Sequence, residues 1–233
     1  MLPALSLLTA ALLAACGGAP RDASSNSASS RPTPAGAPAA ATPTETVPKI
    51  VAFGDSLTAG YGLAPREGYP ALLQKMIDAD GFKYEVVNAG VSGDTSAAGV
   101  RRIDWSLDAG NVRFLILELG ANDFLRGQPV SETRKNLSQI IARAKSRGVR
   151  VLLAGMLTTS ERGRDYETEI SEAFRSLAKE HEVTLIPFFL EGVAGRDELN
   201  QQDRIHPNAE GTRIVAATVY RYLKPMLEQE QKK

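Results

Sequence analysis

The sequence predicts a three-layer α/β sandwich built on a five-stranded parallel sheet. Short, almost continuously apolar runs recur from residue 50 onward, and longer segments with apolar residues at helical spacing separate them. Strands that are apolar on both faces and alternate with amphipathic helices are typical of a parallel sheet covered by helices on both sides.

The five apolar runs are the expected strands: Ile50–Phe53, Tyr84–Asn88, Phe114–Leu119, Val149–Ala154 and Val183–Pro187. The segments between and after them are the expected helices: Tyr69–Ala79, Ser96–Leu107, Ser131–Arg147, Tyr166–His181 and Ala209–Leu223. In the third helix, Leu137, Ile140 and Ile141 fall at helical spacing, and Gly148 is placed to end it. Residues 49–229 are therefore expected to form one folded domain.

Residues 1–15 precede this domain as an apolar stretch that ends in small residues. The stretch is shorter than the roughly 20 residues that a helix needs to cross a bilayer, so a signal peptide explains it better than a permanent span. Leu13-Ala14-Ala15-Cys16-Gly17 resembles the lipobox of bacterial lipoproteins. That resemblance implies a lipid on Cys16 and, because Gly17 is not Asp, an outer-membrane anchor facing the periplasm. A plain signal peptide with a bystander cysteine is the alternative.

Residues 16–48 form a segment dominated by Ala, Ser, Pro, Thr and Gly after the cysteine. Such a composition cannot bury enough apolar surface to fold, so we expect a disordered linker. Its prolines favour an extended tether, whose reach is at most on the order of 100 Å at about 3.1 Å per residue.

The charge balance excludes several classes of function. The chain has 27 Lys and Arg against 27 Asp and Glu, with no run of like charge and no basic aromatic stripe, so nucleic-acid binding is not expected. Only two His and one Cys are present, which excludes a zinc site built from several of them. We expect a small-molecule substrate, no metal or cofactor, membrane contact only through the N-terminal lipid, and a monomer by default.

Polar residues collect where the expected strands end. In a parallel sheet, ligands bind outside the carboxyl ends of the strands. Four of the five loops there combine Gly or Pro with groups able to do chemistry: Gly54-Asp55-Ser56, Gly90-Val91-Ser92-Gly93-Asp94, Gly120-Ala121-Asn122-Asp123 and Asp203-Arg204-Ile205-His206-Pro207. These loops are the expected site.

The four loops supply each group that acyl transfer needs. Ser56 is the candidate nucleophile, and His206 is a candidate general base because a free imidazole pKa of about 6.5 suits proton transfer near neutral pH. Asp203 precedes His206 by three residues and can orient its ring. Asn122 offers a side-chain N–H, and Gly93 a backbone N–H, for the developing oxyanion.

Each candidate also has a structural interpretation. Ser56 could cap the helix that follows it, and Asn122 and Gly93 could be turn residues. Asp94 and Asp123 could be loop-stabilising carboxylates that accept hydrogen bonds from nearby backbone N–H groups. The joint arrival of these residues at successive strand ends favours the catalytic interpretation.

Two further residues compete for the catalytic roles. Ser92 is a rival nucleophile, but the Gly-x-Ser-x-Gly elbow of larger α/β-hydrolases would require Gly where Asp94 stands. His181 lies near the end of an expected helix, where the helix dipole favours a cation, so a structural or solvated role is expected for it.

The four loops together resemble the sequence blocks of the SGNH or GDSL hydrolases, in order. The matching runs are Gly54-Asp55-Ser56-Leu57-Thr58-Ala59-Gly60-Tyr61-Gly62, Asn88-Ala89-Gly90-Val91-Ser92-Gly93-Asp94-Thr95, Gly120-Ala121-Asn122-Asp123 and Asp203-Arg204-Ile205-His206-Pro207-Asn208. The resemblance implies the family's flavodoxin-like fold, Ser56, His206 and Asp203 as the triad, and an oxyanion hole of Gly93, Asn122 and the Ser56 backbone N–H.

Within this family the sequence is most similar to the bacterial periplasmic branch of acyl-CoA thioesterases, lysophospholipases and arylesterases. The residues that carry this similarity are Ser92–Thr95, Glu118–Gly127 and Ile186–Phe189. The resemblance implies a serine esterase acting on acyl esters and thioesters, with an open, largely apolar acyl groove. The loop Met156–Arg164 is more polar than such a groove suggests. A carbohydrate O-deacetylase of the cell envelope and a noncatalytic, lipid-anchored binding domain are the alternatives.

Overall fold

The computed structural model describes residues 46–157 and 164–232. The expected signal peptide, Cys16, the linker up to residue 45 and most of the polar loop that begins at Met156 lie outside the described residues.

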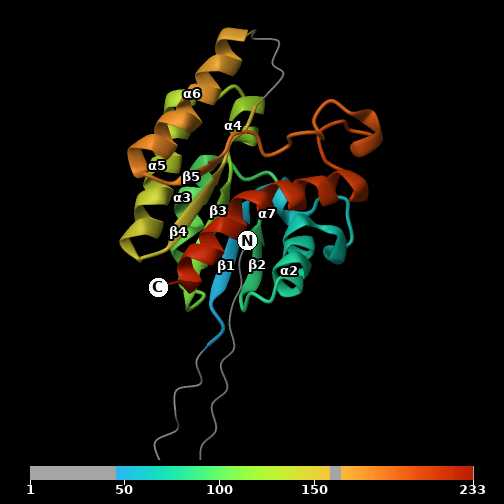
Figure 1. The fold of residues 1–233 in the computed structure, drawn as a ribbon. Helices are drawn as coiled ribbons and strands as arrows, with labels where there is room; N and C mark the ends of the chain where they lie inside the picture. The colour runs from blue at the N-terminus through green and yellow to red at the C-terminus, as the bar shows by residue number, and fades with distance from the viewer. Residues whose placement is uncertain (1–45, 158–163, 233) are drawn as a thin grey trace, which may run out of the picture. The chain divides into compact units, whose positions relative to one another are not determined.

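Five parallel strands form one sheet in the order β2-β1-β3-β4-β5 (Figure 1). They are β1 (Lys49–Gly54), β2 (Glu85–Gly90), β3 (Val112–Glu118), β4 (Arg150–Ala154) and β5 (Thr184–Ile186). The five-stranded parallel sheet predicted from the apolar runs is confirmed, and strand ends differ from the expected ones by two residues at most.

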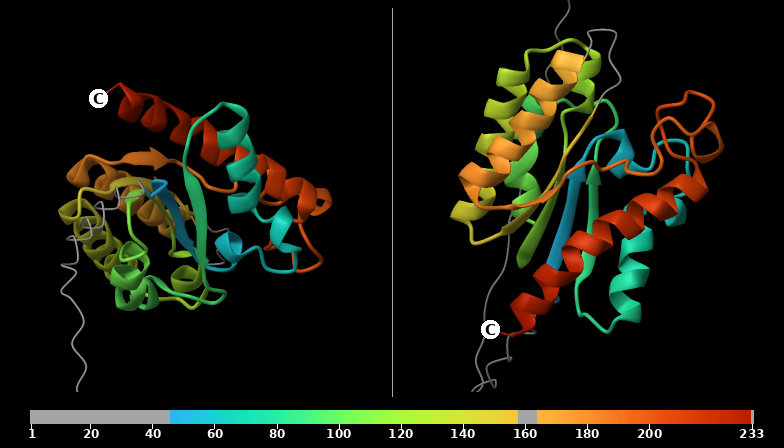
Figure 2. Two further views of the ribbon diagram at one scale, coloured as in Figure 1. Left: turned by 90° about the horizontal axis from the view of Figure 1, so that it is seen from below. Right: turned by 45° about the horizontal axis from the view of Figure 1, so that its top comes forward.

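Helices cover both faces of the sheet, which confirms the three-layer arrangement (Figure 2). The helices are α1 (Ser56–Ala59), α2 (Tyr69–Ala79), α3 (Ser96–Leu107), α4 (Ala121–Leu125), α5 (Val130–Ser146), α6 (Arg164–His181) and α7 (Ala209–Gln231), with 3-10 turns η1 (Pro65–Glu67) and η2 (Asp197–Leu199). Helices α2 and α7 pack together on one face, and α3, α5 and α6 pack side by side on the other. Right-handed crossovers between parallel strands place α2 on one face and α3, α5 and α6 on the other. Helix α7 follows the last strand and packs against α2.

The main departure from the predicted helices is the length of α7. It continues beyond Leu223 to Gln231 and includes Pro225. Met226 and Leu227 are buried against the core, so their burial offsets the backbone hydrogen bond that the proline cannot make. The short α4, η1 and η2 were not predicted, because elements of three to five residues show no periodicity.

The central strands β1 and β3 form the middle of the core. The side chains of Ile50–Phe53 and Phe114–Leu117 are fully buried. Burying one large apolar side chain contributes roughly 1.5–3 kcal/mol to the stability of the fold. The two buried strands therefore hold the loops that follow them in place. The register places Gly54 level with Gly90 of β2 and with Glu118 of β3. Three of the predicted functional loops therefore leave the sheet side by side.

Gly148 ends α5 as the sequence predicted. Its φ is +74°, and the N–H of Val149 donates back to the carbonyl of Ala144. Within residues 46–157 and 164–232, no helix has the length and apolar character that a membrane span requires.

Candidate active site

Ser56 is presented at the start of α1, directly after the central strand β1. Asp55 is the N-cap of this helix, and its Oδ1 accepts a hydrogen bond of 3.0 Å from the N–H of Leu57. The interpretation of Ser56 as the helix cap is therefore wrong. Because Asp55 satisfies the free N–H, the Ser56 hydroxyl remains available for other contacts.

Gly54 permits the close approach on which this turn depends. A Cβ built on Gly54 would lie 2.1 Å from Thr58 Oγ1 and 2.3 Å from Glu118 Oε2. Any side chain at this position would push α1 away from the end of β3. Close packing beneath Ser56 therefore requires glycine at position 54.

The structure brings together the three residues predicted as a catalytic triad. His206 Nε2 lies 2.9 Å from Ser56 Oγ, and Nδ1 lies 2.7 Å from Asp203 Oδ2. Asp203 Oδ1 accepts the backbone N–H groups of Ile205 and His206, both at 3.0 Å. The tight turn that ends at His206 therefore holds the carboxylate beside the ring.

The electrostatics of Asp203 determine the tautomer of His206. Partial desolvation raises the pKa of Asp203, but hydrogen bonds from the backbone N–H groups of His206 and Ile205, and then from the imidazole, outweigh it and hold the pKa at about 2. An ionised carboxylate can only accept, so Nδ1 carries the proton and the lone pair of Nε2 faces the Ser56 hydroxyl. This is the arrangement that a general base requires.

Gln201 and Tyr61 support the base, and neither was predicted. The Tyr61 ring lies against His206 with centroids 4.7 Å apart. Gln201 Nε2 donates to the carbonyls of Tyr61 and Pro207, and the Gln201 N–H donates to the His206 carbonyl at 2.7 Å. One glutamine thereby joins the segment after Ser56 to the His206 loop, and no sequence pattern marks it.

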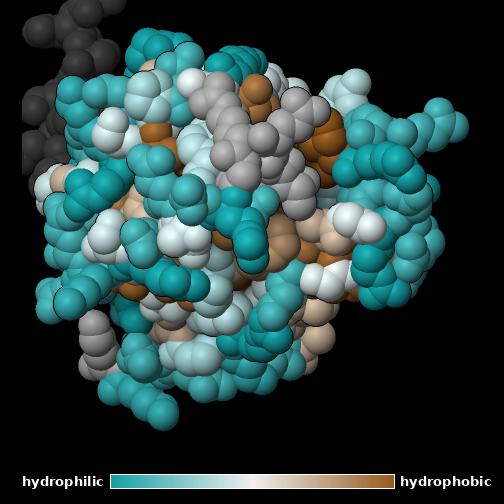
Figure 3. Space-filling model, turned by 90° about the horizontal axis from the view of Figure 1, so that it is seen from above, coloured by the Kyte–Doolittle hydropathy of each residue, from teal (hydrophilic) through white to brown (hydrophobic). Residues whose placement is uncertain are grey.

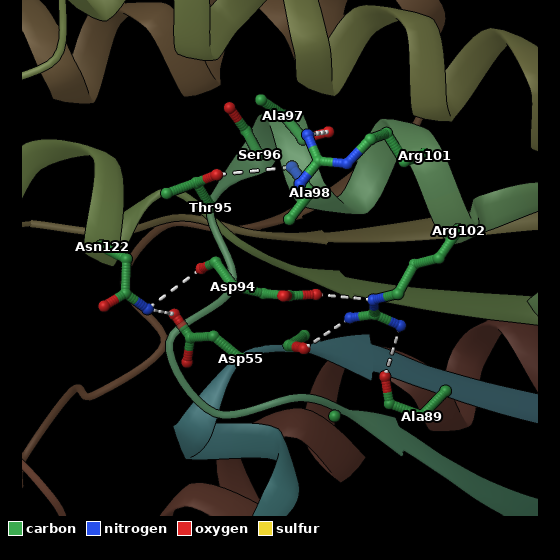
Figure 4. A network of polar contacts seen from close by, with 12 residues as sticks. Asp55, Ala89, Asp94, Thr95, Ser96, Ala97, Ala98, Arg101, Arg102 and Asn122 are labelled. Carbon is green, nitrogen blue, oxygen red and sulfur yellow. Dashed lines mark hydrogen bonds and ion pairs between the residues drawn. The ribbon is translucent and has the colours of Figure 1, made fainter. Parts of the chain in front are cut away.

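Gly93 and Asn122, the predicted oxyanion donors, lie in adjoining loops. Gly93 has a φ of +85° in a turn closed by the hydrogen bond from Asp94 N–H to the Val91 carbonyl, so glycine suits this conformation. Asn122 Nδ2 donates to Asp55 Oδ2 and to the Asp94 carbonyl, both at 3.0 Å (Figure 4). The Asn122 amide thus connects the loops after β1, β2 and β3.

A buried acid lies beneath this junction. Glu118 is fully buried; its Oε2 accepts from the Asp55 N–H at 3.2 Å and from the Thr58 hydroxyl at 2.7 Å. Its Oε1 has no hydrogen-bond partner in the described part of the chain. Burial, and then the nearby Asp55, raise the pKa of Glu118 well above its usual value. Burial and the neighbouring carboxyl group therefore both favour the protonated form of Glu118.

Asp55, the other carboxyl group of this pair, is mostly ionised at neutral pH. Burial raises its pKa to about 6, while hydrogen bonds from the Leu57 N–H and the Asn122 amide work in the opposite direction. Above that pH the carboxylate of Asp55 holds one N–H of Asn122. The Asp of the Gly-Asp-Ser sequence is therefore a structural anchor of both α1 and Asn122.

The other carboxylates at the strand ends stabilise loops in two ways. Asp123 accepts hydrogen bonds from the backbone N–H and the hydroxyl of Ser96, which confirms its predicted role. The carboxylate of Asp94 was expected to bind backbone N–H groups, but it pairs instead with Arg102 at 2.6 Å. The sequence pattern did not reveal this partner, which lies in α3 eight residues further along the chain.

The rival residues do not take part in the triad. Both histidines of the chain are among the described residues: His206 contacts Ser56, and His181 contacts the Ser138 hydroxyl at 2.7 Å. Neither histidine contacts Ser92. Of the two serines that contact an imidazole among the described residues, Ser138 lies within α5 and Ser56 lies at a strand end. His181, half-buried at the end of α6, has the structural role expected for it.

A pocket adjoins Ser56 and His206 and is mainly apolar. Its other lining residues are Leu57, Gly60, Tyr61, Leu63, Tyr69, Phe189, Pro207, Thr212 and Val215. Seen from the carboxyl end of the sheet, apolar residues lie exposed in the middle of a largely hydrophilic face (Figure 3). In residues 46–157 and 164–232, no three His, Cys, Asp or Glu side chains gather in a way that could hold a metal ion.

The chain is similar to known proteins over most of its described length. A model of the GDSL-like Lipase/Acylhydrolase family matches residues 52–214. The chain is 37% identical to Esterase TesA of Pseudomonas aeruginosa over 76% of this chain and 89% of that protein. It is 36% identical to Thioesterase 1/protease 1/lysophospholipase L1 of Escherichia coli K12 over 78% and 86% of the two chains. The solved structure of AlinE4, described as an SGNH-hydrolase family esterase, matches this one with a TM-score of 0.66 and 43% sequence identity. The match covers 77% of this chain and 97% of that one. The chain belongs to the GDSL-like lipase/acylhydrolase family, the SGNH hydrolases.

Proposed function

We propose that the chain is a serine esterase that hydrolyses carboxylic esters of acyl chains through an acyl-enzyme on Ser56. The observation that carries the proposal is the placement of the His206 imidazole between the Ser56 hydroxyl, at 2.9 Å, and Asp203, at 2.7 Å. The names of the relatives, an esterase and a thioesterase/lysophospholipase, support acyl esters as the substrate class and extend the range to thioesters and lysophospholipids.

The first half-reaction forms the acyl-enzyme. His206 Nε2 takes the proton from Ser56 Oγ as the oxygen attacks the acyl carbonyl carbon. The ionised Asp203 stabilises the imidazolium that results. When the tetrahedral intermediate collapses, His206 gives the proton to the leaving alcohol or thiol, and the acyl group remains on Ser56.

The second half-reaction releases the acid. A water molecule loses its proton to His206 and attacks the acyl carbon, and the proton then returns to Ser56 Oγ as the ester bond breaks. The same three residues act in both halves. The residues account for this chemistry without a metal or a cofactor.

The oxyanion is proposed to bind the backbone N–H groups of Ser56 and Gly93 and the amide of Asn122. Both hydrogens of Asn122 Nδ2 already have acceptors, in Asp55 and the Asp94 carbonyl. A substrate oxygen would therefore share one hydrogen in a three-centre bond. Its developing negative charge would strengthen that bond in the transition state, which is where stabilisation accelerates the reaction.

The apolar pocket beside Ser56 is proposed to hold the acyl chain. Leu57, Leu63 and Val215 supply aliphatic walls, and Tyr69 and Phe189 supply aromatic ones. A lining of this kind favours an alkyl chain over a hydrated sugar. An acetyl group fits such a lining as well as a longer acyl chain does, so chain-length preference decides between an acyl esterase and the alternative, a carbohydrate O-deacetylase.

Trapping the nucleophile tests the proposal. An alkyl phosphonate ester should inactivate the enzyme and leave an adduct that peptide mass spectrometry locates on Ser56. Ser56→Ala should hydrolyse p-nitrophenyl esters no faster than background, whereas Ser92→Ala should keep wild-type activity. An adduct on Ser92, or an active Ser56→Ala protein, would refute the mechanism.

The substrate class requires a second measurement. The rate profile over p-nitrophenyl esters from acetate to decanoate should rise with chain length until the pocket is full. Hydrolysis restricted to acetate would instead favour the O-deacetylase. Palmitoyl-CoA and a lysophospholipid, assayed in parallel, test the wider range.

A lipid anchor on Cys16 in the cell envelope is a separate part of the proposal. Its support is the sequence itself: an apolar stretch, small residues before the cysteine, and a linker long enough to tether the domain. Labelling with an alkyne fatty acid should mark the full chain and not Cys16→Ser. Equal labelling of both chains would reject the anchor.

A further inference from the structure

Arg102 joins three segments at the carboxyl end of the sheet. From α3, its Nε donates to Asp94 Oδ2 at 2.6 Å, and its two terminal nitrogens donate to the carbonyls of Ala89 and Gly54, both at 2.8 Å (Figure 4). The guanidinium carbon also lies 3.9 Å from the centre of the Phe53 ring. The planar fork of arginine can make three such bonds at once, and a lysine ammonium cannot reproduce their geometry.

The segments that Arg102 joins carry the proposed oxyanion donors. Gly54 lies two residues before Ser56, and its carbonyl also accepts the N–H of Val91 at the start of the Gly93 turn. Asp94 follows Gly93 directly, and its carbonyl holds the Asn122 amide. One side chain therefore contacts the loops of Ser56 and Gly93 and, through Asp94, reaches Asn122.

The environment makes these contacts stronger than ordinary surface contacts. The side chains of Arg102 and Asp94 are only 19% and 15% exposed, so solvent screens the ion pair less than it screens a surface pair. Arg101, the next residue of the same helix, is exposed and donates to the Ala97 carbonyl of its own helix. The two neighbouring arginines thus differ in their contacts while sharing charge, helix and size.

We propose that Arg102 is a positioning residue for the oxyanion hole: it holds the Ser56 and Gly93 loops at a fixed separation and, through Asp94, sets the acceptor that orients Asn122. The inference rests on the oxyanion hole described under the proposed function. Displacements of about 1 Å can cost on the order of 100-fold in rate, so the loss of a residue that touches no substrate can still lower kcat.

The test compares Arg102→Met and Arg102→Lys with the matched control Arg101→Met. For each variant, kcat and KM are measured with p-nitrophenyl butyrate. The concentration of active sites is determined by phosphonate titration, so that misfolded protein does not lower the measured kcat. We expect kcat to fall about 10- to 100-fold in Arg102→Met, with KM changed only a few-fold. Lysine should restore little of this loss, and Arg101→Met should match the wild type.

A double-mutant cycle with Asn122→Ala separates positioning from general destabilisation. If Arg102 acts through the oxyanion hole, Arg102→Met should cost several-fold less in the Asn122→Ala background than in the wild type. Equal losses in both backgrounds, or wild-type kcat per active site in Arg102→Met, would overturn the inference and leave the proposed function standing. Wild-type kcat in Asn122→Ala alone would overturn the proposed oxyanion hole, and this inference with it.

Discussion

The Nε2 atom of His206 lies 2.9 Å from the Oγ atom of Ser56, although 150 residues of chain separate the two. The serine begins α1 directly after the central strand, and the histidine lies in a tight turn before α7. Their contact places the serine beside a base that Asp203 orients, and the following predictions test the residues around that pair.

Asp203→Asn should lower kcat by a factor on the order of 10³–10⁴. The amide would donate to His206 Nδ1 and favour the tautomer whose Nε2 carries a proton, which cannot act as a base toward Ser56. The measurement is kcat for a p-nitrophenyl ester, with circular dichroism to verify the fold. A loss below about 10-fold would mean that Asp203 does not set the tautomer.

Asn122→Ala should lower kcat by about 10²–10³ while KM changes little, because an oxyanion donor acts mainly in the transition state. The variant also removes the hydrogen bonds to Asp55 and the Asp94 carbonyl, so its thermal midpoint should be measured alongside. A rise in KM at unchanged kcat would assign Asn122 to substrate binding instead.

Glu118→Gln should change how stability depends on pH. The pKa of Glu118 is raised by burial, so the folded protein keeps its proton at pH values where the unfolded chain has lost it. The stability of the wild type should therefore fall by roughly 1 kcal/mol per pH unit from this group as pH rises above its usual pKa of 4.5. Glutamine does not titrate, so the stability of the variant lacks this dependence on pH.

Thermal denaturation of both proteins between pH 5 and pH 8 measures the effect. The midpoint of Glu118→Gln, relative to the wild type, should rise as the pH increases from 5 toward the raised pKa that Glu118 has in the folded protein, whatever offset the buried amide introduces. Activity at pH 7 should stay within a few-fold, since the glutamine carbonyl can still accept from Asp55 N–H and Thr58. Parallel midpoint curves would show that Glu118 is ionised in the folded protein.

Gly54→Ala should destabilise the protein by about 1–3 kcal/mol, the usual cost of overpacking. The added methyl would meet Thr58 Oγ1 at 2.1 Å and Glu118 Oε2 at 2.3 Å. Gly68→Ala is the matched control, because its φ is −62° and its nearest atoms lie 3.7 Å from the added methyl, an ordinary contact distance. Equal thermal midpoints for the two variants would show that the turn before Ser56 can accommodate a methyl group at position 54.

Local sequence patterns were enough to predict the fold class and the main candidate site residues. Apolar runs at strand length and apolar residues at helical spacing gave the five strands and the sandwich, because both periods arise from backbone geometry alone. The sequence also marked Ser56, His206, Asp203, Gly93 and Asn122, since these chemically distinct residues follow strands whose carboxyl ends must meet at one edge.

Only the tertiary structure decided how those residues are supported. Arg102, Glu118 and Gln201 belong to types that are common on any surface, and their roles come from contacts with segments 48, 63 and 140 residues away. The extension of α7 through Pro225 likewise depended on burial against the core rather than on local preference. A residue type limits which bonds a side chain can make, but the packing of distant strands decides which of those bonds it finds.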